Sequence, residues 1–207
     1  MYLPSNYKVT DTKKINQFIR ENNFADLVTV RDGTLYSNKV PFYFDEAKQK
    51  LYGHCGIHNS QLEDIQRNDQ VLIIFSGVDA YISPRWPVSN NMVPTWNFQT
   101  LQVRGKARLL DEVGLISVLD KLSKFHELKY SNPWQLSELD EGFKSKIVKV
   151  IMGFEVDIND IQFKEKMSQN RSRADQLSII DALVQAGDVR STEVADIMRK
   201  NTLTTND

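Results

Sequence analysis

The 207-residue sequence has little cysteine and no long apolar segment. Cys55 is its one cysteine, which excludes a disulfide within the chain and a zinc site built from several cysteines. No segment approaches the roughly 20 apolar residues that a membrane-spanning helix needs. Residues 1–11 also lack an apolar stretch behind a basic patch, the pattern of a secretion signal. We therefore expect a cytoplasmic protein without membrane contact.

Glycine-rich phosphate loops are also missing. Neither Gly-x-Gly-x-x-Gly nor Gly-x-x-x-x-Gly-Lys-Ser/Thr occurs, so the Rossmann and P-loop classes are excluded. The chain has no excess of positive charge either, with a formal net charge of -1 and a pI near 6.3. Non-specific nucleic-acid binding depends on an excess of lysine and arginine. DNA therefore stays a possible partner, but the net charge does not support it.

The first half of the chain is rich in closely spaced predicted strands. After an amphipathic helix at 11–22, apolar patterning predicts a hairpin with Asp32-Gly33 in its turn. The predicted strands are 27–30, 40–44, 50–55, 71–75 and 96–109, with a short helix at 61–66. Residues 81–83 either extend the fourth strand or pair with it. Short connections between such strands favour a small antiparallel, Greek-key-like barrel.

Helical spacing dominates the second half. Further helices are predicted from Asp111 to Phe125, from Phe143 to Val150, at 173–186 and at 191–200, with one more strand at 151–158. The pattern predicts an α+β fold: a β-barrel domain at 1–172 with inserted helices, and a helical extension at 173–207 packed on it.

Three segments, 81–86, 93–98 and 166–172, carry more polar and aromatic side chains than a barrel requires. Trp86 and Trp96 offer flat apolar surface to a planar ring. Directional hydrogen bonds are available from Ser83, Thr95, Asn97, Gln169 and Asn170, and positive charge from Arg85, Lys166 and Arg171. An aromatic cofactor with a phosphate needs all three kinds of group. Barrel corners, dimer contacts and helix caps use the same residue types, so residue chemistry leaves both interpretations open.

Several motifs together resemble the PaiB-like family. They are Tyr-Ile-Ser-Pro-x-Trp at 81–86, Val-Pro-Thr-Trp-Asn-Phe at 93–98, Gly-Phe-Glu-Val-x-Ile at 153–158 and Lys-Met-Ser-Gln-Asn-Arg-Ser at 166–172. Met1-Tyr2-x-Pro4 and Leu51-Tyr52-Gly53-His54 also match the family. Each motif is weak alone, but their common order over nearly the whole chain is specific.

The resemblance implies an FMN-binding split barrel with a helical C-terminal part, usually a homodimer with flavin sites near the subunit interface. Some members are described as negative transcriptional regulators. By position, the residues implied to line the flavin pocket are His54, Asn59, Ser83, Trp86, Thr95, Trp96, Asn97, Lys166, Gln169, Asn170 and Arg171.

One departure from the family pattern concerns the phosphate. Where the family commonly reads Gly-His-x-Ala-Arg-Ala-Asn-Pro, residues 53–60 read Gly-His-Cys-Gly-Ile-His-Asn-Ser, so Ile57 replaces the arginine. Arginine is a natural bidentate phosphate ligand and isoleucine is not. The sequence leaves three outcomes open: weaker flavin binding, a phosphate held by Lys166 or Arg171, or a different ligand.

His54, Cys55 and His58 lie within five positions and suggest a metal site. We expect none, because side chains on a strand that turns near residue 58 need not converge. Cys55 has no lysine or arginine beside it to activate the thiol, and no acid–base pair or nucleophile stands out. The sequence therefore assigns no catalytic residue.

The two C-terminal helices loosely resemble a helix-turn-helix, with Arg190, Arg199 and Lys200 as basic residues. Acidic residues interrupt that charge, which favours packing on the barrel or on a second subunit. Three functions follow in order of support: a flavin-binding protein of undefined reaction, a ligand-responsive negative transcriptional regulator, and a flavin-dependent reductase or oxidase.

Overall fold

The structure, a computed structural model, describes residues 1–89 and 92–204. The chain forms two compact units. We call Asn16–Phe75 with Gln102–Ile161 the central unit, and Met1–Ile15 with Ser76–Leu101 and Gln162–Asp207 the terminal unit. Strands β5, β6 and β7 each have residues in both. The predicted boundary at residue 172 stays a prediction.

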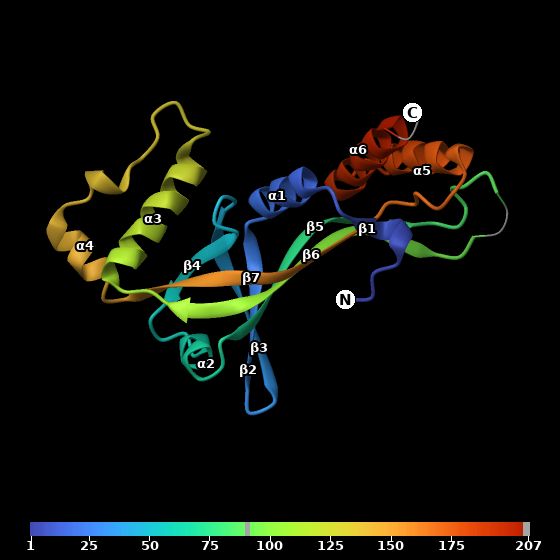
Figure 1. The fold of residues 1–207 in the computed structure, drawn as a ribbon. Coiled ribbons are helices and arrows are strands. Elements are labelled where there is room, and N and C mark those ends of the chain that lie inside the picture. The colour runs from blue at the N-terminus through green and yellow to red at the C-terminus, as the bar shows by residue number, and fades with distance from the viewer. Residues whose placement is uncertain (90–91, 205–207) are drawn as a thin grey trace. The chain divides into compact units, whose positions relative to one another are not determined.

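The fold is α+β, as the sequence predicts. Its strands form one sheet in the order β1-β7-β4-β3-β2-β5-β6, with a further pairing of β7 to β6 (Figure 1). The strands are β1 (Lys8–Val9), β2 (Phe24–Arg31), β3 (Thr34–Asp45), β4 (Lys50–Gly56), β5 (Gln70–Ile82), β6 (Thr95–Leu109) and β7 (Ile151–Lys166). The helices are η1 (Ser5–Tyr7), α1 (Thr12–Glu21), α2 (Gln61–Arg67), α3 (Glu112–Glu127), η2 (Leu136–Glu138), α4 (Glu141–Ile147), α5 (Arg173–Ala186) and α6 (Val189–Thr204).

In the central unit, β2 and β3 form the predicted hairpin. Arg31 pairs with Thr34, which leaves a two-residue turn. Asp32 and Gly33 both have positive φ, 49° and 78°, as a hairpin turn that follows the strand twist requires. The core of this unit contains packed phenylalanines among aliphatic side chains, and the ring of Phe42 lies 6.0 Å from the rings of both Phe75 and Phe154.

Helix α3 covers one face of the central unit. Its buried Val118 and Leu122 pack against Tyr52 of β4. The Asp111 side chain accepts a hydrogen bond from the N–H of Gly114 and caps the helix. Where β6 runs beside β7, a Cβ on Gly105 would clash with the carbonyl oxygen of Asp157, so the close approach needs glycine.

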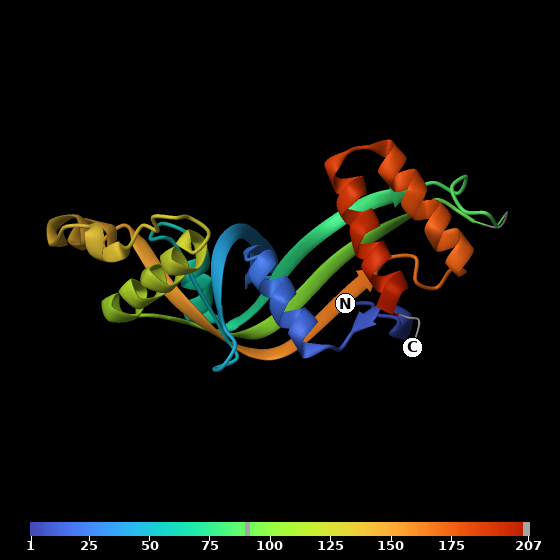
Figure 2. The same cartoon turned by 90° about the horizontal axis from the view of Figure 1, so that it is seen from above.

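The terminal unit is organised around the helical pair α5–α6 (Figure 2). Gly187 ends α5 in the left-handed conformation, φ 73°, and the chain turns directly into α6. Ile179 and Leu183 of α5 and Val194 of α6 are buried in one cluster with Ile82 and Met167. The two C-terminal helices therefore pack on the strand ends of their own unit.

Several elements run further than predicted. Residues 81 and 82 are part of β5, which confirms that this segment extends the strand and does not pair with it. Strand β7 continues past 158 to Lys166, and α6 begins at Val189 and ends at Thr204. Helix α4 ends at Ile147, so Val150 lies outside it. Over the described ranges, no helix has the length and hydropathy needed to cross a membrane.

Candidate functional site

Four basic side chains gather in the terminal unit. Lys164 and Lys166 are two residues apart on β7 and therefore lie on the same face of the strand. Lys8 of β1 is the cross-strand partner of Lys164, and Arg171 follows in the turn after β7. We call Lys8, Lys164, Lys166 and Arg171 the basic cluster.

The ammonium group of Lys166 is held by two uncharged oxygens. Its Nζ donates to the hydroxyl of Thr95 and, at 2.9 Å, to the carbonyl oxygen of Trp96. Burial lowers the pKa of Lys166, and the positive charges of Lys164 and Arg171 lower it further. The local potential is therefore positive, as an anion-binding site requires.

Within the described ranges, no carboxylate forms an ion pair with any member of the basic cluster. Lys8 faces Lys164 directly, and like charges in that position destabilise an antiparallel pair. Sheets normally avoid such a pair or compensate it. The cluster therefore has the charge arrangement of a site that a bound anion would complete.

Aromatic side chains lie beside the cluster. Trp96 is 52% exposed, and the ring of Tyr81 meets it edge to face at 5.9 Å. The Lys164 ammonium lies 5.4 Å from the ring centres of both Tyr2 and Phe98. Open indole surface next to positive charge suits a ligand with a planar ring and an anionic tail.

The side chains of two predicted pocket residues are hydrogen-bonded within the protein. Asn97 is fully buried, its Oδ1 accepts from the Ser168 hydroxyl at 3.0 Å, and its Nδ2 donates to Met198 Sδ at 3.3 Å. The Gln169 side chain is partly buried, its Nε2 donates to the carbonyl oxygen of Glu165, and its Oε1 accepts from the N–H of Met167. Both residues shape the turn that carries Arg171. Asn170, in the same turn, is exposed.

Ser83 and Trp86 lie in the turn that follows β5. Ser83 Oγ accepts from the N–H of Arg85, and its carbonyl accepts from the N–H of Trp86. The Trp86 side chain is partly buried against the α5–α6 cluster, and its carbonyl accepts from the Ser178 hydroxyl. Trp86 thus packs on α5, whereas Trp96 leaves half of its surface open.

The structure places His54 and Asn59 in the central unit. His54 Nδ1 is buried and has no hydrogen-bond partner among the described residues, and burial lowers the pKa of the ring. The Asn59 side chain accepts from the N–H of Gln61 at the start of α2 and bonds to the Cys55 thiol. Ile57 is 38% exposed. His54 thus offers one free buried nitrogen, while Asn59 is engaged locally.

Over the described part of the chain, no group of three or more histidine, cysteine or acidic side chains is arranged to bind a metal ion. Burial raises the pKa of Cys55 to about 11, which keeps the thiol protonated and unreactive at neutral pH. On α6, Arg190 lies 3.4 Å from Asp79 and Arg199 lies 3.1 Å from Asp196. Acidic neighbours thus compensate two of the basic residues expected of a DNA-binding helix.

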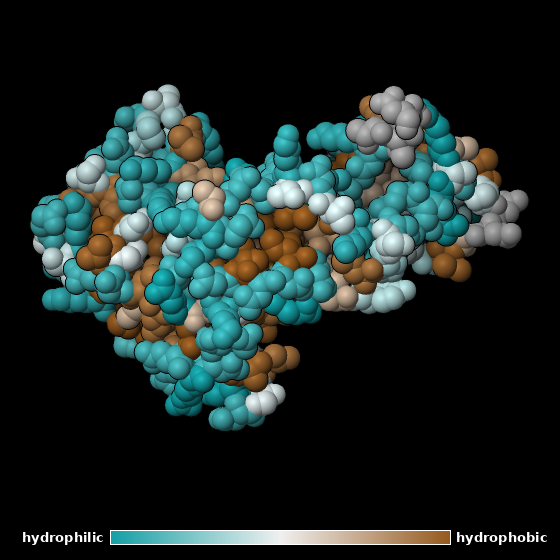
Figure 3. Space-filling model, in the orientation of Figure 1, coloured by the Kyte–Doolittle hydropathy of each residue, from teal (hydrophilic) through white to brown (hydrophobic). Residues whose placement is uncertain are grey.

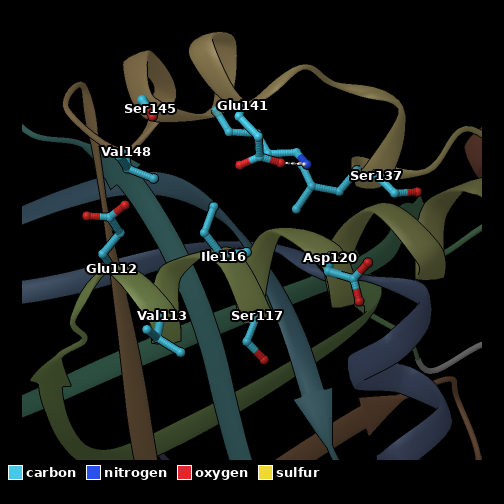
Figure 4. A pocket seen from close by; sticks show the side chains of 11 residues that line it. Glu112, Val113, Ile116, Ser117, Asp120, Ser137, Glu141, Ser145 and Val148 are labelled. Carbon is cyan, nitrogen blue, oxygen red and sulfur yellow. Dashed lines mark hydrogen bonds and ion pairs between the residues drawn. The ribbon is translucent and has the colours of Figure 1, made fainter.

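A pocket of about 500 Å³ opens between α3, η2 and α4 in the central unit (Figure 4). The side chains of Glu112 and Ile116 face it, and Glu141 on its rim pairs with Lys144 at 2.7 Å. In the same region apolar groups are scattered among hydrophilic ones at the surface (Figure 3). No predicted pocket residue lines this cavity.

Sequence reasoning missed three members of the site: Lys8, Lys164 and Tyr81. Lys164 lies two residues before Lys166, and a strand predicted to reach 166 would have placed both on one face. Tyr81 lay in a segment already singled out, but its pairing with Trp96 depends on how β5 and β6 align. Lys8 joins the cluster only through the short strand β1, for which the sequence has no pattern.

Residues 1–160 match the family described as "Putative FMN-binding domain". The chain is 32% identical over 200 residues to protease synthase and sporulation protein PAI 2 of Bacillus subtilis, covering 96% of each protein.

Among solved structures, the chain is similar to the FAD and heme binding protein of Mycobacterium smegmatis: TM-score 0.61, 13% identity, 77% of this chain and 73% of that one. It is also similar to the flavocytochrome Anf3 of Azotobacter vinelandii, with TM-score 0.55, 14% identity, and 77% and 69% coverage. These two likenesses confirm the split-barrel fold. Together with the family match and the full-length similarity to PAI 2, they show that the chain belongs to the PaiB-like family of FMN-binding split-barrel proteins.

Proposed function

We propose that this protein binds FMN, with the flavin phosphate at the basic cluster and the ring system against Trp96. The observation that supports this most strongly is the uncompensated positive charge of the cluster: Lys8 faces Lys164 across the sheet, and Lys166 bonds only to neutral oxygens. A phosphate would relieve the repulsion and supply the missing acceptors.

The chemistry of the site fits the family's cofactor. Arg171 can bind phosphate oxygens in a bidentate way, Lys164 and Lys166 add point charges, and the Thr95 hydroxyl can donate once Lys166 turns to the anion. Trp96 presents open aromatic surface of the kind that stacks on a ring. A bound flavin would supply electron and hydride transfer, while these side chains would bind and orient it.

The basic cluster can also replace the phosphate-binding arginine of the family, at whose position this chain has Ile57. The exposed isoleucine offers no charge to a phosphate, but Arg171 and the three lysines of the cluster do. Of the three outcomes left open by the sequence, we favour a phosphate held by Lys166 and Arg171. We propose supporting roles for Ser83, Trp86, Asn97, Gln169 and Asn170 in shaping the site. Ligand contacts by His54 and Asn59, which belong to the central unit, stay a prediction.

Titration with FMN tests the proposal, followed by flavin and tryptophan fluorescence. We expect saturable binding and quenching of the tryptophan signal, because stacking near Trp96 brings the two rings together. Arg171→Gln should weaken binding at least about tenfold, since a charge-assisted hydrogen bond is worth roughly 1.5–3 kcal/mol.

Arg104→Gln is the matched control. Arg104 is an exposed arginine on β6 paired with Asp160 at 2.9 Å, and it lies outside the cluster. Its loss should leave FMN affinity unchanged. Absence of saturable binding at micromolar FMN, or equal losses in both variants, would refute the phosphate site.

We further propose a homodimer in the cytoplasm. Tyr81 and Trp96 expose 44% and 52% of their surfaces, more than large aromatic side chains usually leave to water. A second subunit would cover the part of this pair that the flavin ring leaves exposed. Sedimentation equilibrium should give twice the chain mass, and a monomer at micromolar concentration would contradict this part of the proposal.

A ligand-responsive regulator is the second candidate. It is supported by the similarity to PAI 2, which is named a protease synthase and sporulation protein. It is also supported by the contact of Asn97 with Met198, which connects the turn beside the basic cluster to α6. A sequence-selective gel shift that changes on adding FMN would support it, and salt-insensitive or absent DNA binding would exclude it.

A further inference from the structure

The Lys166 amine has the hydrogen-bonding environment of a neutral amine. A neutral amine has two N–H groups and one lone pair, whereas an ammonium ion has three N–H groups. Nζ has two acceptors, the Thr95 hydroxyl and the Trp96 carbonyl, and no third partner among the described residues. Two acceptors are enough for the neutral form, whose lone pair would then be free to react.

The charges around Nζ favour the same form. Lys164 lies on the same face of β7, and Arg171 follows in the next turn, so both add positive charge. The acidic neighbour in sequence, Glu165, points to the opposite face of the strand, where it pairs with Lys14 at 2.7 Å. Burial and adjacent cations are the two conditions that turn a lysine into a nucleophile.

We propose that Lys166 is a nucleophilic lysine that condenses with phosphorylated aldehydes. The phosphate of such a ligand would lie against Arg171, Lys164 and Lys8, and its ring against Trp96. Nζ attacks the aldehyde carbon, the carbonyl oxygen leaves as water after taking up two protons, and a C=N bond joins ligand and lysine. The step is a dehydration without oxidant or reductant, and water reverses it.

Pyridoxal 5′-phosphate is a suitable probe, because it combines an aldehyde, a planar ring and a phosphate. The protein is incubated with substoichiometric probe, the imine is reduced with borohydride to a stable secondary amine, and the labelled lysine is identified by peptide mass mapping. We expect the label on Lys166, with far less on Lys14 and Lys106, whose amines are paired with carboxylates. Label spread evenly over the lysines would overturn the proposal.

Two further measurements separate a reactive lysine from an accessible one. Pyridoxal without phosphate should label Lys166 several-fold less, and inorganic phosphate should protect it. In Lys164→Gln, loss of a neighbouring cation should raise the pKa of Lys166, so its labelling at pH 7 should fall about threefold and its pH profile should move upward. Lys106→Gln should change neither. A pH profile that is the same in all three proteins would contradict the proposal.

The inference shares the basic cluster with the proposed FMN site but can fail independently of it. Saturable FMN binding with unselective labelling would leave the flavin site intact and remove the nucleophile. Selective labelling of Lys166 without FMN binding would keep the nucleophile and redirect the cluster to phosphorylated aldehydes.

Discussion

The buried carboxylates of the central unit and the basic cluster of the terminal unit differ in their partners. In the central unit, Glu155 is 5% exposed and accepts from Lys50 and Arg108, both at 2.6 Å. Asp64 is 1% exposed and is held by Arg31. In the terminal unit, the basic cluster has no carboxylate partner among the described residues. These two carboxylates of the central unit are thus compensated by cations, whereas, over the described ranges, the charges of the basic cluster are not.

The two faces of strand β7 show the same difference within the terminal unit. Glu165 on one face is 3% exposed and accepts from Lys14, Gln99 and Asn201. Lys164 and Lys166 on the other face have only neutral acceptors. Alternation along the strand therefore separates a network of paired charges from the face that carries the candidate binding site.

The largest effect should come from breaking a balanced pair. Asp64→Ala removes the carboxylate partner of Arg31 and the acceptor of the buried Thr29 hydroxyl, so we expect a loss of about 3 kcal/mol in the free energy of unfolding. Urea denaturation followed by circular dichroism measures it. Asp160→Ala, which removes an exposed pair with Arg104, should cost less than about 1 kcal/mol. Equal losses in the two variants would mean that burial does not determine how much these ion pairs contribute to the free energy of unfolding.

The same carboxylate should make the protein sensitive to acid. Burial would raise the pKa of Asp64, but hydrogen bonds from Arg31 and Thr29 outweigh it, and the net pKa is lowered. A lowered folded-state pKa means that the contribution is present above the unfolded pKa, about 3.9, and is lost as pH falls through the folded pKa. Stability of the wild type should therefore drop below about pH 4. Asp64→Asn should show a shallower drop, and an unchanged slope would contradict this assignment.

The smallest effect on stability should come from the basic cluster, whose charges have no carboxylate partner in the described part of the chain. Lys164→Gln removes the repulsion with Lys8, so without ligand the variant should be as stable as the wild type or more stable by up to roughly 0.5 kcal/mol. Lys39→Gln, which breaks an ion pair of 2.9 Å with Asp26, should be slightly destabilising instead. Thermal unfolding in phosphate-free buffer compares the two. A clear loss of stability in Lys164→Gln would show that Lys164 is structural.

Sequence patterns were sufficient for most of the fold, because helix and strand periods are local. The hairpin at Asp32-Gly33 and the buried strand β5 follow from turn chemistry and apolar spacing. The second half of β7 was missed because residues 159–166 carry polar side chains on one face, and their pairing with β1 is a long-range property. Such pairing leaves no trace in a short window of sequence.

For the site, the sequence identified which residue types were available but not how they were used. Lys166, Arg171 and Trp96 lie in or beside the basic cluster, and their role in binding stays a prediction. Asn97 was selected for the same chemistry, yet it is buried and bonded to Ser168 and Met198. Burial and hydrogen-bond partners distinguish a ligand-facing amide from a structural one, and neither can be read from residue type.

The most direct test of the account compares FMN with riboflavin, which lacks the phosphate. Isothermal titration would measure both ligands on the wild type and on Lys164→Gln/Arg171→Gln. We predict that the wild type binds FMN at least about tenfold more tightly than riboflavin, and that this preference largely disappears in the double variant while riboflavin affinity is unchanged. Equal affinities in the wild type, or a preference that survives in the double variant, would show that the basic cluster does not bind the phosphate.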